Sequence, residues 1–316
     1  MTQASSALRL LAIDGGTVLN EITAFLLENS ISFFENEPMK NHTSFRIGGN
    51  ARLFIEVKNE RELTLVLEEC KKLSLEPFII GNGSNLLVSD GGIERPVVKL
   101  CGDFEKITLI DETTVRAGAG AMLVSLCRFA LENFLSGLEF AFGIPGTVGG
   151  AAFMNAGAYG GEMKDVVSLC EHVDQNGKKG EISKESLSFG YRKSVYAENG
   201  CIVTFVTFKL QKGSKEEIEN KMNELLSRRK DKQPLSFPSA GSVFKRPEGY
   251  FAGALIEQSG LKGKRIGGAA VSEKHAGFIV NLGGATCSDV CALIDCCQRT
   301  VFEKFGVRLE TEIKMI

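Results

Sequence analysis

The chain has 316 residues, 43% of them hydrophobic and 24% charged, and a formal net charge of −2. This balance is typical of a folded globular protein, and it excludes a global electrostatic attraction to nucleic acid or to anionic membranes. No apolar run reaches the roughly 18 residues that a membrane-spanning helix requires, so we expect neither kind of partner. The length predicts two or three domains. Residues 1–16 match no later pattern, and their LRLLAI segment is too short and too weakly basic for a signal peptide, so we interpret them as a mobile tail.

The first predicted elements form a β-α-β unit. A helix is expected over residues 18–29 and a strand over 51–57, and Asn59 with Glu62 three residues later resembles an N-cap with its N3 acid. The helix that they open carries an apolar stripe, and the buried strand 77–80 follows it. That strand runs into GNGSNLLVSDGG, a glycine-rich loop at the strand's carboxyl end, where α/β sheets bind ligands.

This loop does not match the common nucleotide-binding fingerprints. After Gly81 and Gly83, the third glycine position of a Rossmann loop is occupied by Leu86, and no helix follows directly. No Lys-Ser or Lys-Thr pair follows to complete a P-loop. A nucleotide at this loop would therefore be held in a different fold.

The rest of the chain mixes strand and helix patterns. Ser214 with Glu217 resembles a capping box that opens a helix, which must end before Gln233-Pro234. A helix near residues 288–304 and a terminal strand at 307–316 complete the chain. The elements expected before Ser214 are strands at 113–117, 166–173 and 201–210, a helix at 122–134, and a turn at 175–177.

An unusual segment lies between residues 143 and 161, where seven of nineteen residues are glycine. Glycine costs about 1 kcal/mol relative to alanine inside a helix, and the segment has little side chain to bury in a core. It offers backbone N–H groups and close approach to a flat or phosphorylated ligand. A ligand cradle and a small-residue loop packed against other backbone are the two interpretations, and we favour the cradle. Ile144-Pro145-Gly146 predicts a type II turn with a positive φ at the glycine.

Charge and cysteine are unevenly placed. Between Arg228 and Arg265 there are nine Lys or Arg residues and three Asp or Glu residues, a local excess of +6. A solvated basic face and an anion-binding cleft both fit such a run. The number of cysteines, nine, is odd, so at least one cannot join an intrachain disulfide, which favours the reducing cytoplasm. No metal site is predicted, because the C-terminal cysteines contain no C-x-x-C pair and fit buried helical thiols better; they are Cys287, Cys291, Cys296 and Cys297.

Eight short segments occur in a characteristic order between Asn41 and the C-terminus. They are NHTSFRIGG, IGNGSNLLVSDGG, FGIPGTVGGAAFMNAGAYGGE, FGYRKS, RRKDKQP, PSAGSVFK, IGGAAVSEKHAGFIVN and LETEIK. Each alone would be weak evidence, but the ordered set closely resembles the UDP-N-acetylenolpyruvoylglucosamine reductases, the MurB family of bacterial cell-wall synthesis. Only the first residues of the chain lie outside the resemblance.

The resemblance implies an α+β fold, with a two-part FAD-binding domain of the vanillyl-alcohol-oxidase (PCMH) type and a C-terminal α/β substrate-binding domain. These parts would span residues 17–100, 101–212 and 213–316. FAD would be bound non-covalently, which accounts for the missing Rossmann fingerprint, and NADPH would donate the hydride. The residues implied to hold FAD are Gly81, Asn82, Gly83, Ser84, Asn85, Gly143, Pro145, Gly146, Gly149, Gly150, Asn155 and Arg229, with Gln233 as a further candidate.

The family reaction reduces the enolpyruvyl double bond of a UDP-sugar, and its catalytic residues correspond to Arg192 of FGYR, Ser242 of GSVFK and Glu312 of LETE. Hydride addition to an α,β-unsaturated carboxylate moves negative charge toward the carboxylate, which Arg192 can grip while it stays charged. The Ser242 hydroxyl can donate a proton to the other carbon. An ionised Glu312 would repel an enolate, so Glu312 is either protonated or hydrogen-bonded to the Arg192 side of the site.

Six further residues are candidates for substrate contacts, with Lys245 and Lys264 suited to the diphosphate. The chain departs from the family at Arg246, where asparagine is common. It ends four residues after Glu312 and its substrate region is compact, which resembles the shorter type II subgroup without the closing tyrosine loop of type I. The six residues are Tyr191, Lys245, Arg246, Lys264, His275 and Asn281.

Two other functions stay open at this point, an FAD oxidase of the same fold acting on a small hydroxy acid and a nucleotide-sugar binding protein without turnover. The basic run argues against the oxidase, because a small acid would not need it. The presence of Arg192, Ser242 and Glu312 in three distant segments argues against the inert binder. We therefore predict a cytoplasmic, NADPH-dependent flavin reductase of a UDP-sugar in peptidoglycan precursor synthesis, acting as a monomer or weak oligomer.

Overall fold

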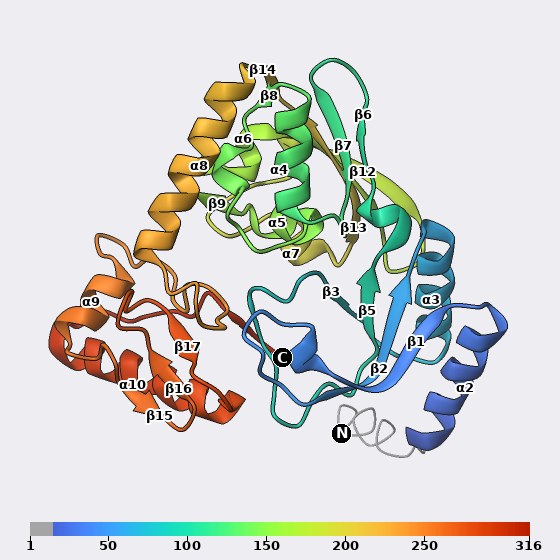
Figure 1. The fold of residues 1–316 in the computed structure, drawn as a ribbon. Helices are drawn as coiled ribbons and strands as arrows, with labels where there is room; N and C mark the ends of the chain where they lie inside the picture. The colour runs from blue at the N-terminus through green and yellow to red at the C-terminus, as the bar shows by residue number, and fades with distance from the viewer. Residues whose placement is uncertain (1–14) are drawn as a thin grey trace.

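The computed structural model describes residues 15–316. The predicted tail lies outside the described residues except for Gly15 and Gly16, which already belong to helix α2 (Gly15–Glu28). Figure 1 shows three groups of elements: a sheet containing β1, β2 and β5, a second sheet above it, and the orange to red C-terminal elements beside both. Within residues 15–316, no helix is long and apolar enough to cross a membrane.

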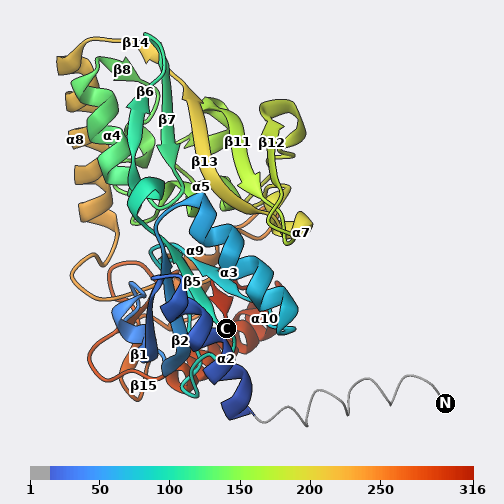
Figure 2. The same cartoon turned by 90° about the vertical axis from the view of Figure 1, so that its right-hand side faces the viewer.

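The first group is a four-stranded sheet with two helices. Its strand order is β1-β2-β5-β3, and β2 and β3 both pair in parallel with β5, so the predicted β-α-β unit is confirmed with β5 between its strands. The predicted cap is also confirmed, because the Asn59 side chain accepts a hydrogen bond of 3.0 Å from the Glu62 N–H. Helix α2 packs against α3 (Figure 2). The elements are α2, β1 (Ser32–Pro38), β2 (Asn50–Val57), α3 (Glu60–Lys72), β3 (Phe78–Ile80), β4 (Leu86–Leu87) and β5 (Val97–Leu100).

The second group is built on a five-stranded antiparallel sheet in the order β12-β11-β13-β7-β6. The strands and the helix predicted here are confirmed, with ends that differ by no more than two residues. Helix α5 packs on β13 and β7. The elements are β6 (Ile107–Leu109), β7 (Thr114–Gly118), α4 (Leu123–Glu132), β8 (Leu135–Ser136), α5 (Val148–Met154), β9 (Gly157–Ala158), β10 (Gly161–Glu162), α6 (Met163–Val166), β11 (Val167–Val173), β12 (Lys179–Ser183), α7 (Tyr196–Asn199), β13 (Ile202–Lys209) and β14 (Gln211–Lys212).

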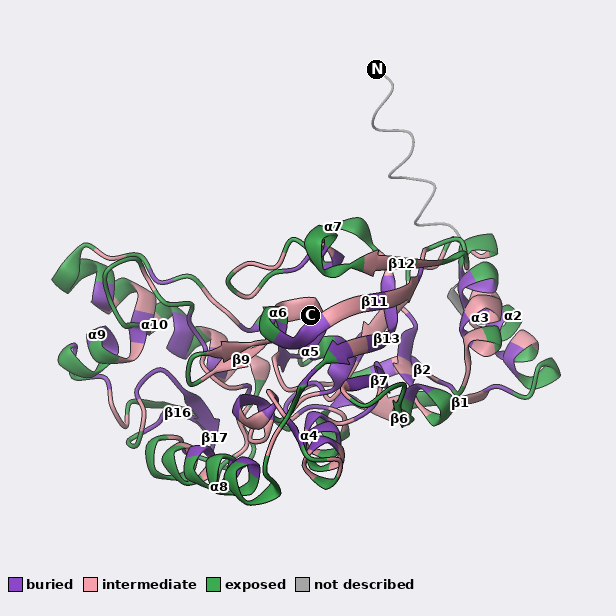
Figure 3. Cartoon of the chain, turned by 90° about the horizontal axis from the view of Figure 1, so that it is seen from above, coloured by how far each residue is buried: buried purple, intermediate pink, exposed green. Residues whose placement is uncertain are grey.

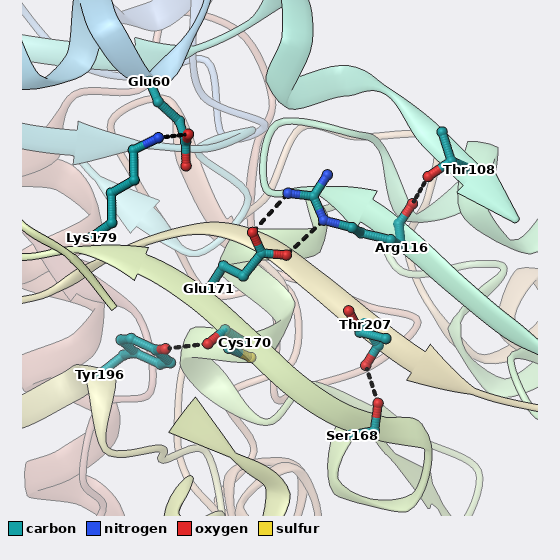
Figure 4. Close-up of polar contacts among 9 residues, drawn as sticks. All are labelled: Glu60, Thr108, Arg116, Ser168, Cys170, Glu171, Lys179, Tyr196 and Thr207. Atoms are coloured by element: carbon teal, nitrogen blue, oxygen red, sulfur yellow. Dashed lines mark hydrogen bonds and ion pairs between the residues drawn. The ribbon is translucent and has the colours of Figure 1, made fainter. Parts of the chain in front are cut away.

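Charged side chains brace this second sheet and join it to the first group (Figure 4). Arg116 of β7 and Glu171 of β11 reach across the strand between them and form two hydrogen bonds of 2.6 and 2.7 Å. The Arg116 guanidinium carbon lies 3.5 Å from the centroid of the Phe205 ring on that strand. Lys179 of β12 pairs with Glu60 of α3. The two sheets are therefore fixed relative to each other by polar contacts as well as by their shared core.

The glycine-rich segment contains a helix, contrary to the expectation from its composition. Helix α5 is capped by Thr147, whose hydroxyl accepts a hydrogen bond of 3.4 Å from the Gly150 N–H. Glycine serves close packing in this helix, because a Cβ on Gly149 would lie 2.6 Å from the Cβ of Ala119. The contact between α5 and the chain beyond β7 thus outweighs the low helix propensity of glycine.

Two other local predictions are wrong. Gly146 does not adopt a positive φ, and its N–H donates to the Ile144 carbonyl at 3.0 Å in a three-residue turn rather than a type II turn. Of the predicted terminal strand 307–316, only β18 (Lys314–Met315) forms, and it pairs in parallel with β4 of the first group. The residues before β18 do not continue a sheet, and among them Thr311 makes one isolated antiparallel bridge to Phe244.

The third group contains a small antiparallel sheet, β15-β16-β17, and its helices. Ser214 caps α8 as predicted, accepting a hydrogen bond of 3.3 Å from the Glu217 N–H. Helix α8 packs against α4 and buries Ile218 and Met222 in the core of the second group, while its outer face is exposed (Figure 3). The domain boundary at residue 213 stays a prediction. The elements are α8 (Lys215–Lys232), α9 (Ala252–Gln258), β15 (Arg265–Ile266), β16 (Ala269–Val271), β17 (Ile279–Asn281), α10 (Cys287–Phe305) and β18.

Polar contacts hold the C-terminal elements against the first group. Asn281 Nδ2 donates to the Phe45 carbonyl at 3.1 Å, and Ser44 Oγ donates to the Ser239 carbonyl at 2.7 Å. Asp90 accepts the first N–H groups of α10, at 2.7 and 3.0 Å. The apolar core of the C-terminal elements also includes side chains of the first group. These contacts fix the C-terminal loops against the first group, which carries the glycine-rich residues 81–85.

Candidate active site

The two glycine-rich segments lie against each other although they are far apart in the sequence. A Cβ on Gly81 would lie 2.5 Å from Thr147 Oγ1, so only glycine fits at this contact. Asn82 Nδ2 donates to the Pro145 carbonyl at 3.3 Å. The result is one surface lined mainly by backbone, which we call the cradle and define as residues 81–85 together with 143–150.

Arg192 and Glu312 form an ion pair at one end of this surface. Arg192 Nε donates to Glu312 Oε1 at 2.7 Å, and Arg192 Nη2 lies 3.5 Å from the Gly157 carbonyl. The side chains are 24% and 12% exposed, respectively. Of the two arrangements considered for Glu312, the structure has the hydrogen bond to Arg192. The pair is partly buried, but its side chains keep some exposure to solvent. A small acidic ligand could therefore contact the guanidinium N–H groups of Arg192 that Glu312 does not use.

Arg192 is held by the loop between β12 and α7. Its own backbone is left-handed, with φ of 54°, an uncommon conformation for a residue other than glycine. The Tyr191 hydroxyl accepts a hydrogen bond of 3.3 Å from the Arg246 N–H, which joins this loop to the one that carries Ser242. The Arg246 guanidinium lies 4.0 Å from the Phe251 ring centroid. The Tyr191 ring lies beside the ion pair, with its centroid 5.2 Å from the Arg192 guanidinium carbon.

Ser242 reaches the same place through backbone contacts. The Glu312 N–H donates to the carbonyl of Val243, the residue after Ser242, at 2.7 Å. Ser242 Oγ donates to the Phe244 carbonyl at 3.2 Å. The hydroxyl is thus partnered within its own turn, and it contributes a proton that can be redirected by rotation about its Cα–Cβ bond.

Asn85 joins the cradle to the segment that carries Glu312. Its Nδ2 donates to the Glu312 carbonyl at 3.1 Å and lies 3.4 Å from Met154 Sδ. The backbone carbonyl of Asn85 accepts a hydrogen bond of 2.9 Å from the Lys314 N–H. One side chain therefore contacts both α5 and the C-terminal segment, and it places the ion pair next to the cradle.

Comparison with known proteins identifies the family. Residues 233–316 match the family described as UDP-N-acetylenolpyruvoylglucosamine reductase, C-terminal domain, and residues 51–183 match the one described as FAD binding domain. The chain is 51% identical over 281 residues to the UDP-N-acetylenolpyruvoylglucosamine reductase of Caldanaerobacter subterraneus subsp. tengcongensis and 49% identical to that of Clostridioides difficile, with 89% of this chain and 92% of each relative covered. The chain belongs to the UDP-N-acetylenolpyruvoylglucosamine reductase family.

A solved member of this family has the same fold. The crystal structure of UDP-N-acetylenolpyruvylglucosamine reductase (MurB) from Thermus caldophilus superposes with a TM-score of 0.77 at 39% identity, covering 90% of this chain and 98% of that one. The expected α+β fold, with an FAD-binding part and a C-terminal domain of the reductase family, is therefore confirmed.

Unpartnered buried polar atoms near the cradle fit the FAD that this family's binding domain implies. Arg229 Nε and Gln233 Oε1 are buried and have no hydrogen-bond partner within residues 15–316. Arg229 lies against Gly143, and burial lowers the pKa of its guanidinium. Leaving such atoms unpaired costs roughly 1–3 kcal/mol each. A ligand with acceptors and donors at this place would remove that cost, so the residues present fit the cofactor.

Some predicted site residues have their side chains engaged elsewhere. Asn155 is fully buried, with hydrogen bonds to Glu162, the Gly190 carbonyl and the Lys164 N–H. Asn281 binds backbone groups of the first group and of its own loop. Both amides therefore have partners within the protein, and their contacts to a ligand stay predictions.

Three predicted substrate residues lie in different settings. Lys245 pairs with Glu310 at 3.1 Å on the surface. His275 Nδ1 accepts the Gly277 N–H at 3.1 Å, and burial lowers the pKa of the imidazole. Lys264 is exposed and precedes β15, the edge strand of the C-terminal sheet. The basic run is thus spread over several elements, and part of its charge is neutralised in ion pairs.

Sequence reasoning missed Thr147, Met154 and Gly157. Thr147 contacts Gly81, Met154 contacts Asn85, and the Gly157 carbonyl contacts Arg192. All three lie in the glycine-rich segment, so the signal for the region was present. The individual residues were not identifiable, because each acts through a partner more than 30 positions away.

Proposed function

We propose that this chain reduces UDP-N-acetylenolpyruvoylglucosamine to UDP-N-acetylmuramate for peptidoglycan precursor synthesis, with non-covalent FAD and with NADPH as hydride donor. The observation that carries the proposal is the Arg192–Glu312 ion pair at 2.7 Å beside the cradle. Membership of the reductase family supports the substrate class. When bound, FAD would supply the hydride transfer between NADPH and the enolpyruvyl double bond.

Arg192 would hold the carboxylate of the substrate. Its Nε is occupied by Glu312, so the terminal guanidinium nitrogens would face the ligand and would keep their charge throughout. Because Glu312 is paired with this cation, its negative charge would be partly offset near a developing enolate. Glu312 would thus orient Arg192, and Arg192 would stabilise charge that grows in the transition state.

Ser242 would deliver a proton from Oγ to the carbon that does not receive hydride. The hydroxyl would leave the Phe244 carbonyl, turn toward the substrate, and regain a proton from water. The cradle would hold the FAD pyrophosphate and ring system, with Arg229 and Gln233 supplying polar contacts. Arg246 and Tyr191, which are joined by a hydrogen bond, would lie beside the substrate.

An anaerobic reaction tests the proposal. The purified holoprotein should be yellow, NADPH should bleach it, and the UDP-sugar should restore the colour while gaining two hydrogens by mass spectrometry. A protein that NADPH does not bleach but that a small hydroxy acid bleaches would be the oxidase. A protein whose flavin neither reductant bleaches would be a binder. We further propose a cytoplasmic location, which the nine free cysteines support. The protein would act as a monomer or weak oligomer, with domains at residues 17–100, 101–212 and 213–316.

A further inference from the structure

Three sulfur atoms meet where the first turns of α10 face the C-terminal strand. Cys287 and Cys291 are one helical turn apart, and their Sγ atoms are 3.9 Å apart. Cys291 Sγ also lies 3.8 Å from the Sδ of Met315 in β18. Both cysteines are half-buried and reduced, and Met315 is 55% exposed. The cluster is therefore accessible from solvent. None of its three residues belongs to the cradle or to the Arg192–Glu312 ion pair.

We propose that Cys287, Cys291 and Met315 form a binding site for a soft monovalent metal ion, Cu(I). Sulfur ligands on an ion with metal–sulfur bonds of about 2.3 Å lie roughly 3.8 Å apart in tetrahedral geometry and roughly 4.0 Å apart in trigonal geometry. The two sulfur–sulfur distances in the structure fall in this range. Two of the three sulfur–sulfur distances of such a site are thus already present, both of them from Cys291.

The ligand types favour Cu(I) over Zn(II). Thiolate and thioether sulfur are the soft donors that select Cu(I), whereas structural zinc sites in proteins have four ligands and use no thioether. Among residues 15–316, no group of three or more His, Cys, Asp and Glu side chains is arranged to hold a metal ion. The third sulfur comes from Met315, which is 24 positions from Cys291. Cysteine spacing alone therefore gives no metal motif.

Binding has a defined proton balance. Both cysteines are free thiols, and a thiol must lose its proton to bind a metal ion. One Cu(I) ion would replace the two thiol protons and release both to solvent, and no oxidant or reductant is consumed. The resulting charge of −1 would lie near the N-terminal end of α10, where the helix dipole favours it and the carboxylate of Asp90, which accepts the first N–H groups of the helix, opposes it.

An ion at this site would join α10 to the segment that carries Glu312. Met315 is three residues after Glu312, and β18 pairs with β4, which directly follows the cradle residues 81–85. Occupancy would therefore restrain the C-terminal strand. This role is independent of the proposed reaction, because none of the three sulfur ligands touches the ion pair.

Equilibrium dialysis under anaerobic, reducing conditions tests the site. The holoprotein is dialysed against Cu(I) buffered with bicinchoninate, and bound copper is measured by atomic absorption. We expect one ion per chain, loss of this ion in Cys287→Ser and in Cys291→Ser, and binding weakened by roughly tenfold in Met315→Leu, which removes one of three ligands. Cys296→Ser, a half-buried cysteine on the same helix outside the cluster, should bind copper like the parent.

Several results would overturn the proposal. Copper retained at full affinity by Cys291→Ser, or lost by Cys296→Ser, would place the ion elsewhere. Preferential binding of Zn(II) over Cu(I) would contradict the soft-ligand argument. A third result would also overturn it: no copper bound under anaerobic conditions, together with a Cys287–Cys291 disulfide that forms when the reduced, copper-free protein is briefly exposed to air. The two cysteines would then be a redox pair and not metal ligands. Flavin content measured on every variant ensures that only folded protein is compared.

Discussion

Arg192 Nε and Glu312 Oε1 are 2.7 Å apart although 120 positions separate the two residues. The contact joins a left-handed loop residue to the C-terminal segment, and Asn85 binds the carbonyl of the same glutamate from the cradle. Glu312 is therefore the residue at which three distant segments meet, through its carboxylate and its backbone carbonyl. Most of the following predictions concern this point and its surroundings.

Glu312→Gln should slow turnover of the UDP-sugar by about 10²-fold, because it removes the charge that orients Arg192 while keeping the shape. Bleaching of the flavin by NADPH should change little. The matched control is Glu310→Gln, which alters an exposed glutamate two residues earlier. Stopped-flow absorbance of each half-reaction measures both effects. Equal rates in Glu312→Gln and Glu310→Gln would remove the ion pair from the mechanism.

Ser242→Ala should leave flavin reduction by NADPH nearly intact and slow reoxidation by saturating UDP-sugar by about 10²-fold or more, since only the second half-reaction needs the proton. Ser242→Cys should recover part of the rate if sulfur fits the turn. Ser236→Ala, at an exposed serine of the same loop, is the control. A wild-type reoxidation rate in Ser242→Ala would leave Glu312 or water as the acid.

Gly149→Val should yield protein with little bound flavin and a free energy of unfolding lowered by about 1–3 kcal/mol. The reason is steric, because a Cβ at this position would lie 2.6 Å from the Ala119 Cβ and would push the start of α5, which is part of the cradle, away from Ala119. Absorbance of released flavin and urea unfolding measure the two effects. Gly91→Ala, where a Cβ would meet Ser89 Oγ at 3.6 Å, is the control. Full flavin content in Gly149→Val would contradict the cradle.

Lys245→Ala should raise the KM for the UDP-sugar by roughly tenfold, which corresponds to about 1.4 kcal/mol, with a smaller effect on flavin reduction. We expect this because Lys245 is close to the loop of Ser242 and can exchange its surface partner Glu310 for a diphosphate. Lys262→Ala, which breaks a comparable surface pair with Glu257, should have no effect on KM. Equal losses in both half-reactions would assign Lys245 a structural role.

Stability should fall as the pH drops below about 6.5, the usual pKa of histidine. Burial lowers the pKa of His275 in the folded protein, so the unfolded chain takes up the proton first and is favoured by acid. Protonation would also remove Nδ1 as the acceptor of the Gly277 N–H. Urea unfolding of parent and His275→Gln at several pH values measures this. A decline of the same size in both proteins would refute the assignment to His275.

The sequence by itself determined the features that depend on neighbouring residues. The Asn59 and Ser214 caps formed as predicted, because a cap is a contact between residues three positions apart. The strands and helices with regular apolar patterns also lie where expected, and the ordered family segments identified the reductase family before any contact was known.

Only the tertiary structure decided features that depend on distant partners. Helix α5 forms despite its glycines because Gly149 packs against Ala119, and the terminal strand shortens to β18 because its only ladder is with β4. The amides of Asn155 and Asn281 bind protein groups that are distant in the sequence or lie on another loop. The Arg192–Glu312 pair spans 120 positions. No local pattern encodes such contacts, since the free energy that selects them arises only when the separate segments are packed together.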